Sequence, residues 1–80
     1  MNPPKYPPEE MRRQVTGTTV LIVSIDASGG VLDVEVEKSS GNRNLDRAAQ
    51  TAARKWRFNP EIKNGQKVAS RVRVPVEFKL

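Results

Sequence analysis

The sequence predicts a small α+β domain: a three-stranded antiparallel sheet with one long and one short helix packed on one face. Three segments have the residue pattern of strands, and an apolar stripe at helical spacing lies between the second and the third. A chain of 80 residues forms one domain, which buries about 60% of the surface that its unfolded form exposes. We expect a proline-rich lead-in over residues 1–7 and the domain over residues 8–80.

The first eight residues hold four of the six prolines, which favours an extended and stiff lead-in. Pro8 suits the first position of a short helix, because the N–H that it lacks is not needed there. Glu9 and Glu10 then lie at the positive end of the helix dipole. We expect this helix to reach Gln14 and the first strand to open at Gly17.

Residues 18–26 are apolar or β-branched on both faces, which is typical of a strand in the middle of a sheet. Gly29 and Gly30 can adopt positive φ in the tight connection that follows. The next segment then alternates between an apolar face, with Leu32, Val34 and Val36, and an acidic one. The two segments predict a β-hairpin.

A long helix follows the break at residues 39–42, and Asn42 is a suitable N-cap for it. Its apolar stripe falls at offsets 0, 3, 4, 7 and 11, formed by Leu45, Ala48, Ala49, Ala52 and Trp56. We expect the small alanines to let the helix approach the sheet closely, with Leu45 and Trp56 at its two ends. Pro60 prevents the helix from continuing.

After the Asn64-Gly65 turn, residues 68–80 alternate strictly, which predicts one long strand. One face carries Val68, Ser70, Val72, Val74, Val76, Phe78 and Leu80, and the other carries Ala69, Arg71, Arg73, Pro75, Glu77 and Lys79. Proline has no N–H to donate to a ladder, so Pro75 indicates an edge strand with its nitrogen turned away from the neighbour. The predicted strand order is 2-1-3, with the first strand central.

The residue types argue against catalysis and metal binding. The chain contains no His and no Cys, which excludes imidazole bases, thiol nucleophiles and the common zinc sites. No lysine follows Gly29-Gly30 at phosphate-loop spacing. We therefore expect no enzyme activity, no catalytic residue, no metal and no cofactor.

The net charge is +5, from 14 basic and nine acidic residues, and such a balance attracts nucleic acid or anionic surfaces. The signs are mixed along the chain, however, and binders of single strands interleave basic residues with exposed aromatic ones. Three of the four aromatic residues fit the core, and only Tyr6 is left free for stacking. We expect no nucleic-acid partner. No segment approaches the roughly 20 apolar residues that a membrane helix needs.

On physical grounds an exposed edge strand has two readings. Its free backbone groups can accept a strand from another chain, with specificity from alternate side chains. Alternatively, Pro75 and the charges of Arg71, Arg73 and Lys79 block such pairing. An open edge also permits strand exchange between two copies, which makes a homodimer possible.

A series of short motifs runs in order along nearly the whole chain. They are Tyr6-Pro7, Gly17, Asp26-x-x-Gly29-x-Val31, Ser39-Ser40-Gly41, Leu45-Asp46-x-Ala48-Ala49, Trp56-Arg57-Phe58-x-Pro60, Asn64-Gly65 and Val72-Arg73-Val74-Pro75-Val76-x-Phe78. In this order and spacing they resemble the C-terminal domain of TonB-family energy transducers. The resemblance implies a periplasmic domain of an inner-membrane protein, with an anchor helix and most of a proline-rich spacer outside these 80 residues.

The resemblance also implies a function. Such a domain captures the TonB box, a short segment of an outer-membrane transporter, by strand addition to its last strand. It thereby couples proton-motive force to substrate uptake, as for iron siderophores, and an inner-membrane proton-channel complex acts through the anchor. The alternative is an envelope scaffold or self-association module of the same fold, similar to TolA and not linked to transport.

The resemblance and the alternation together predict the binding residues. The expected edge comprises Val68, Ala69, Ser70, Arg71, Val72, Arg73, Val74 and Val76. Tyr6 and Pro7 match the lead-in motif of the family, near which the plug of the transporter is contacted.

Overall fold

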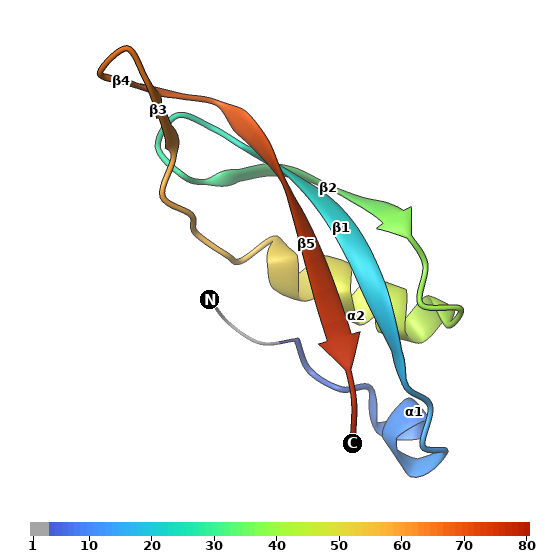
Figure 1. Ribbon diagram of the computed structural model, residues 1–80. Helices are drawn as coiled ribbons and strands as arrows, with labels where there is room; N and C mark the ends of the chain where they lie inside the picture. Colours follow the sequence, from blue (N-terminus) through green and yellow to red (C-terminus); the bar gives the residue numbers. More distant parts are fainter. Residues whose placement is uncertain (1–3) are drawn as a thin grey trace.

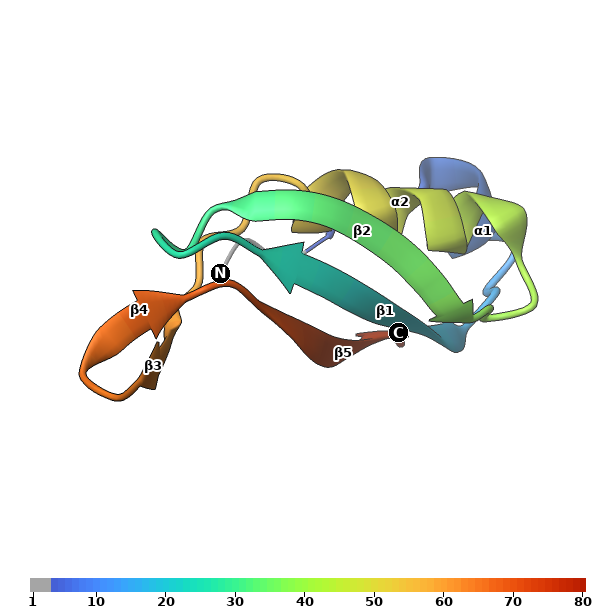
Figure 2. The same ribbon diagram turned by 90° about the horizontal axis from the view of Figure 1, so that it is seen from above.

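The computed structural model describes residues 4–80, which form a three-stranded antiparallel sheet with two helices on one face (Figures 1 and 2). The elements are α1 (Pro8–Arg12), β1 (Gly17–Ile25), β2 (Val31–Lys38), α2 (Arg43–Ala53), β3 (Glu61–Lys63), β4 (Gln66–Val68) and β5 (Ser70–Phe78). The order in the sheet is β2-β1-β5, so the predicted fold class and strand order are confirmed. Residues 1–3 of the expected lead-in lie outside the described part of the chain.

Strand β1 is the centre of the sheet and pairs antiparallel with both neighbours. Alternate residues from Thr19 to Ile25 point toward the helices and are at most 1% exposed. On the opposite face Val20 is also buried, whereas Ile22 and Ser24 are half-buried. The two apolar faces of this segment therefore reflect its central position, as the sequence indicated.

The expected apolar face of β2 is wrong at Leu32, which is 65% exposed. Ser24 pairs with Asp33 and Ile25 pairs with Val31, so Leu32 is an extra residue in the ladder. Such a β-bulge changes which side chains face the core. Val31 packs against the core in its place.

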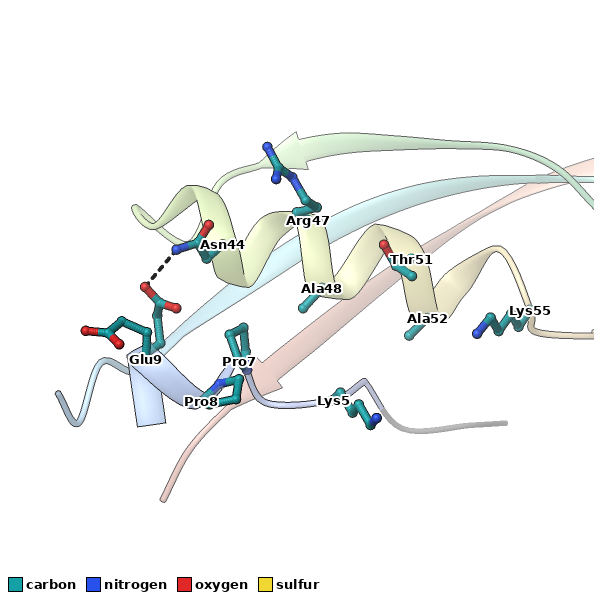
Figure 3. A pocket seen from close by; sticks show the side chains of 11 residues that line it. Lys5, Pro7, Pro8, Glu9, Asn44, Arg47, Ala48, Thr51, Ala52 and Lys55 are labelled. Carbon is teal, nitrogen blue, oxygen red and sulfur yellow. Dashed lines mark hydrogen bonds between the residues drawn. The ribbon is translucent and has the colours of Figure 1, made fainter. Parts of the chain in front are cut away.

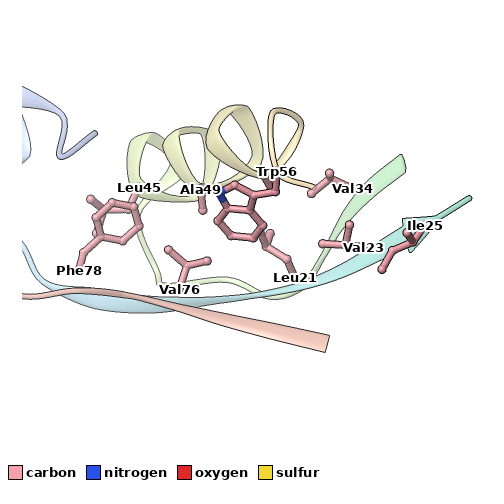
Figure 4. Packing of buried hydrophobic residues seen from close by; sticks show 10 residues of the cluster. Leu21, Val23, Ile25, Val34, Leu45, Ala49, Trp56, Val76 and Phe78 are labelled. Atoms are coloured by element: carbon pink, nitrogen blue, oxygen red, sulfur yellow. The ribbon is translucent and has the colours of Figure 1, made fainter. Parts of the chain in front are cut away.

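Helix α2 covers the sheet, and Figure 4 shows Leu45, Ala49 and Trp56 lying above strand residues such as Leu21. Its N-cap is Asn42, as predicted, whose side chain accepts hydrogen bonds from the N–H groups of Asn44 and Leu45. The helix ends at Ala53, so Trp56 is buried but lies beyond it.

Two tighter bonds explain the early end of the helix. Lys55 N–H donates to Ala52 and Trp56 N–H donates to Ala53, both over three residues. The buried residues of α2 are Leu45, Ala49 and Ala53. Ala48 and Ala52, which the predicted stripe also included, are only half-buried.

The turn between β1 and β2 is built around Asp26, whose carboxylate accepts hydrogen bonds from Ser28 and from the Gly30 N–H. The Ser28 side chain and then the Gly30 N–H lower the pKa of Asp26. Gly29 has φ of +91°, and a Cβ there would overlap the Phe58 carbonyl oxygen. Phe58 N–H donates to the Gly29 carbonyl, which ties the segment after α2 to this hairpin.

Helix α1 begins at Pro8, as expected, but ends at Arg12 rather than Gln14. Gln14 has φ of +56°, in the left-handed region, and cannot continue a right-handed helix. This backbone reversal turns the chain into β1 at Gly17.

The expected single strand over residues 68–80 is wrong at both ends. β5 spans Ser70–Phe78, Ala69 is outside any strand, and Leu80 is 66% exposed. Val68 belongs to β4, which pairs with β3 in a separate hairpin. Alternation continues from β4 into β5, so the pattern could not reveal that the chain changes partner strands.

The β3–β4 hairpin projects from one end of the molecule (Figure 1). Its turn is the predicted Asn64-Gly65 pair, with positive φ of 53° and 77° at the two residues. Ile62 in the hairpin is 67% exposed, so few apolar contacts hold this hairpin to the body.

Candidate functional site

Strand β5 lies at the edge of the sheet, as Pro75 predicted. Its pairing with β1 extends from Ser70 opposite Ile25 to Phe78 opposite Gly17. Its other edge has no strand partner among residues 4–80. The free edge is therefore a continuous row of backbone groups nine residues long.

The two faces of β5 have different roles. Val76 and Phe78 are buried under the helices, and the even-numbered residues before them are half-buried. The odd-numbered side chains, including Arg71, Arg73 and Pro75, lie exposed on the open face of the sheet. The inward side chains fix the strand to the core and leave the outward face accessible.

The two arginines form ion pairs across the central strand. Arg71 lies 3.3 Å from Glu35, and Arg73 Nε lies 2.7 Å from Glu37. Both glutamates lie on β2, so each ion pair crosses over the central strand β1. Ile22 of β1 is paired with Glu35 on one side and with Arg73 on the other. These side chains are 43–65% exposed, and such pairs contribute only about 0–1 kcal/mol to stability.

A second bulge positions one of these pairs. Val20 pairs with Lys38 and Leu21 pairs with Val36, so Glu37 is the extra residue. Beside it, a hollow of about 290 Å³ is lined by Ile22, Glu37, Arg71, Val72 and Arg73. The sequence showed the acidic row of β2 and the basic row of β5 but not their pairing, which depends on strand order and bulges.

Tyr6 is not free for stacking, so that interpretation of the sequence is wrong. Its ring packs edge-on against Phe78 with 5.4 Å between centroids, and its hydroxyl donates to the Val15 carbonyl. Pro7, next to it, is half-buried and lines a groove beside α2. The lead-in is thereby held at the end of β5.

The ten predicted binding residues do not form one cluster. Five of them lie on β5 between Ser70 and Val74, with Val76 further along. Val68 pairs with Glu61 in the β3–β4 hairpin, and Ala69 connects the two strands. Tyr6 lies at the opposite end of β5 from this hairpin (Figure 1).

The start of α2 is fixed to the sheet by Asp46. Its Oδ1 accepts from Thr19 Oγ1 at 2.7 Å and from the N–H and hydroxyl of Ser40 at 2.9 and 2.8 Å, and Oδ2 accepts from Ser39. Partial burial acts to raise the pKa of Asp46, but the hydrogen bonds from Ser39, Ser40 and Thr19 outweigh it and lower the pKa. The carboxylate thus connects α2, β1 and the preceding loop.

Within residues 4–80, no group of three or more acidic side chains is arranged to hold a metal ion. None of the helices in this part of the chain has the length and apolar character needed to span a membrane.

The class of protein that these features define is a small α+β domain whose sheet is covered by helices on one face and ends in an open edge strand. Residues 2–80 match the family model described as Gram-negative bacterial TonB protein C-terminal. The chain belongs to this family, the C-terminal domains of TonB-type energy transducers.

Relatives and solved structures agree with this assignment. A protein named Protein TonB from Xanthomonas campestris pv. campestris is 64% identical over the whole chain, which covers 36% of that relative. Another from Vibrio cholerae is 36% identical over 96% of the chain and 32% of the relative. The chain thus spans about a third of the length of these relatives.

The fold comparison gives the same result. The solution NMR structure of the Pseudomonas aeruginosa TonB C-terminal domain superposes with a TM-score of 0.84 at 32% identity, covering 100% of this chain and 81% of that one. For the Helicobacter pylori TonB C-terminal domain the TM-score is 0.70 at 25% identity, with 95% and 68% covered.

Proposed function

We propose that this domain captures the TonB box of an outer-membrane transporter as an added strand on the free edge of β5. In this proposal it is the periplasmic end of an inner-membrane protein. An anchor and a proton-channel complex beyond these residues supply work from the proton-motive force for substrate uptake. The observation that carries the proposal is the outer side of β5, Ser70–Phe78, which has no strand partner within the described residues 4–80.

The register of the edge limits where a strand can be added. A proline in an edge strand directs its nitrogen to the free side of the strand. Along a strand, the backbone N–H groups of successive residues point alternately to one side and to the other. The N–H groups of Arg71 and Arg73 therefore point the same way as the Pro75 nitrogen. An added strand would receive hydrogen bonds from the N–H groups of Arg71 and Arg73 and none from Pro75, so we expect the binding segment at Ser70–Val74.

The side chains of the same segment provide specificity. Arg71 and Arg73 are 65% and 60% exposed on the open face, next to where alternate side chains of an added strand would lie. Their present partners, Glu35 and Glu37, are held by weak exposed pairs that a bound acidic side chain can replace.

The experiment is an NMR titration of the ¹⁵N-labelled domain with a TonB-box peptide. We expect the largest shifts at the amides of Ser70–Val74, with smaller ones at Tyr6. Shifts confined to β2 or α2, or none at millimolar peptide, would refute the proposal.

The alternative function, a self-association or scaffold module, also has an observation in its favour. β2 is the other edge of the sheet, so each of the two outer strands has one side without a strand partner in the described part of the chain. Sedimentation of the domain as a monomer at high concentration would count against this alternative, and a concentration-dependent dimer without peptide binding would favour it.

A further inference from the structure

A groove of about 690 Å³ runs between α2 and the lead-in segment (Figure 3). Helix α2 lies on the covered face of the sheet, away from the open face (Figure 2). Ala48 and Ala52 of α2 face Pro7 and Pro8 across it, which makes its centre apolar. The volume lies within the range of sites that bind ligands. From Asn44 to Ala52 the helix rises about 12 Å, the length of about four extended residues.

The two ends of the groove differ in charge. Figure 3 shows Lys5 and Lys55 at one end, and at the other Asn44 and Glu9, which forms an ion pair with Arg12. Lys5 and Lys55 are exposed, and neither forms an ion pair with any of the residues that the structure describes. An anionic group bound at this end would interact favourably with both lysines.

The other end contains a buried carboxylate that can accept a further hydrogen bond. Glu10 is 2% exposed and lines the groove. Its Oε2 accepts from the Asn44 side chain at 2.9 Å, whereas its Oε1 has no hydrogen-bond partner within residues 4–80. A buried acceptor without a donor destabilises the protein by about 1–3 kcal/mol, so a donor brought by a ligand would be favourable.

The charges and the buried acceptor together indicate which class of ligand would fit the groove. A simple anion would satisfy Lys5 and Lys55 but bring no donor for Glu10, and a cation would be repelled by the lysines. A peptide carries both backbone N–H donors and acidic side chains. We propose that this groove binds an extended acidic peptide segment of a protein partner, with small apolar residues over Ala48 and Ala52.

This site is separate from the β5 edge, so the two can be tested independently. An array of random pentapeptides would be probed at low salt with the labelled domain. Wild-type protein is expected to enrich peptides with net negative charge. Lys55→Glu reverses an exposed charge and should weaken the enriched peptides about tenfold, and Ala52→Arg should block the groove.

The matched control is Lys63→Glu, an equal charge reversal of an exposed lysine in the β3–β4 hairpin, outside both the groove and the Ser70–Val74 segment. It should leave acidic-peptide binding unchanged, whereas Lys55→Glu should weaken acidic-peptide binding and leave TonB-box binding unchanged. Backbone N-methylation of the best peptide should also reduce binding, because it removes the donors offered to Glu10. Absence of acidic enrichment, or equal loss in Lys55→Glu and Lys63→Glu, would overturn the proposal.

Discussion

Replacing Asp46 with alanine tests how α2 is held on the sheet. Asp46 accepts hydrogen bonds from Thr19, Ser39 and Ser40, and Thr19 is fully buried. Hydrogen bonds to a charged group contribute about 1.5–3 kcal/mol, and a buried hydroxyl left without a partner costs about 1–3 kcal/mol. Ser39 is exposed and can bond to water instead, so we expect a loss of about 3 kcal/mol. For a domain of this size that lowers Tm by about 12–24 °C.

Thermal unfolding followed by circular dichroism measures this loss, with Asp33→Ala as the control. Asp33 is an exposed acid on β2 whose side chain forms no ion pair within residues 4–80, and its replacement should change stability by less than about 0.5 kcal/mol. A Tm for Asp46→Ala within about 3 °C of the Asp33→Ala value would refute the reasoning.

The same variant has a defined pH dependence. The pKa of Asp46 is lower in the folded protein than its ordinary value of 3.8. The carboxylate therefore stabilises the fold fully at pH values above 3.8, and this stabilisation is lost as the pH falls through the folded-state pKa. The Tm difference between wild type and Asp46→Ala should therefore be constant near neutral pH and shrink below about pH 4. A difference that grows on acidification would contradict the lowered pKa.

Four further substitutions test other contacts by thermal unfolding. Gly29→Ala should destabilise the domain by about 2 kcal/mol or more, since the new Cβ overlaps a backbone carbonyl at φ +91°. Gly41→Ala, at φ +94° with open space around it, should lose only about 1 kcal/mol, and equal losses would exclude the overlap as the cause. Tyr6→Phe removes a hydrogen bond to a backbone carbonyl and should cost about 1 kcal/mol; no loss would show that the ring alone holds the lead-in. Glu10→Gln should raise Tm by a few degrees, because a neutral side chain is less costly to bury than a carboxylate with one unpartnered oxygen; a lower Tm would contradict this.

Local signals in the sequence predicted most of the fold. Pro75 placed the last strand at the edge, Asn42 marked the start of α2, and the period-two alternation identified which residues of β5 face the core. Each of these depends on the backbone chemistry of one residue or on a short pattern. The features that the sequence missed depend on contacts between distant segments.

The β-bulges and the change of partner strand are examples. Leu32 is exposed because of an extra residue in the β1–β2 ladder, and Val68 leaves the sheet because β3 pairs with β4. Neither event alters the alternation that a sequence displays. Tyr6 was misjudged for the same reason, since its partner Phe78 lies 72 residues away in the chain.

The candidate site was predictable only in part. The edge itself followed from Pro75, but the pairing of Arg73 with Glu37 requires both the strand order and the bulge at Glu37. The groove beside α2 depends on where the lead-in packs, and no pattern in residues 4–10 specifies that position.

The most direct test of strand addition compares Arg73→Pro with Arg73→Ala in binding to a TonB-box peptide. Both variants remove the side chain, and only proline also removes the N–H on the free edge, where an edge strand tolerates it. We expect similar Tm values for the two variants and a peptide affinity about tenfold weaker for Arg73→Pro than for Arg73→Ala, because one hydrogen bond worth about 1.4 kcal/mol is lost. Equal affinities for two equally stable variants would contradict capture by backbone pairing along β5.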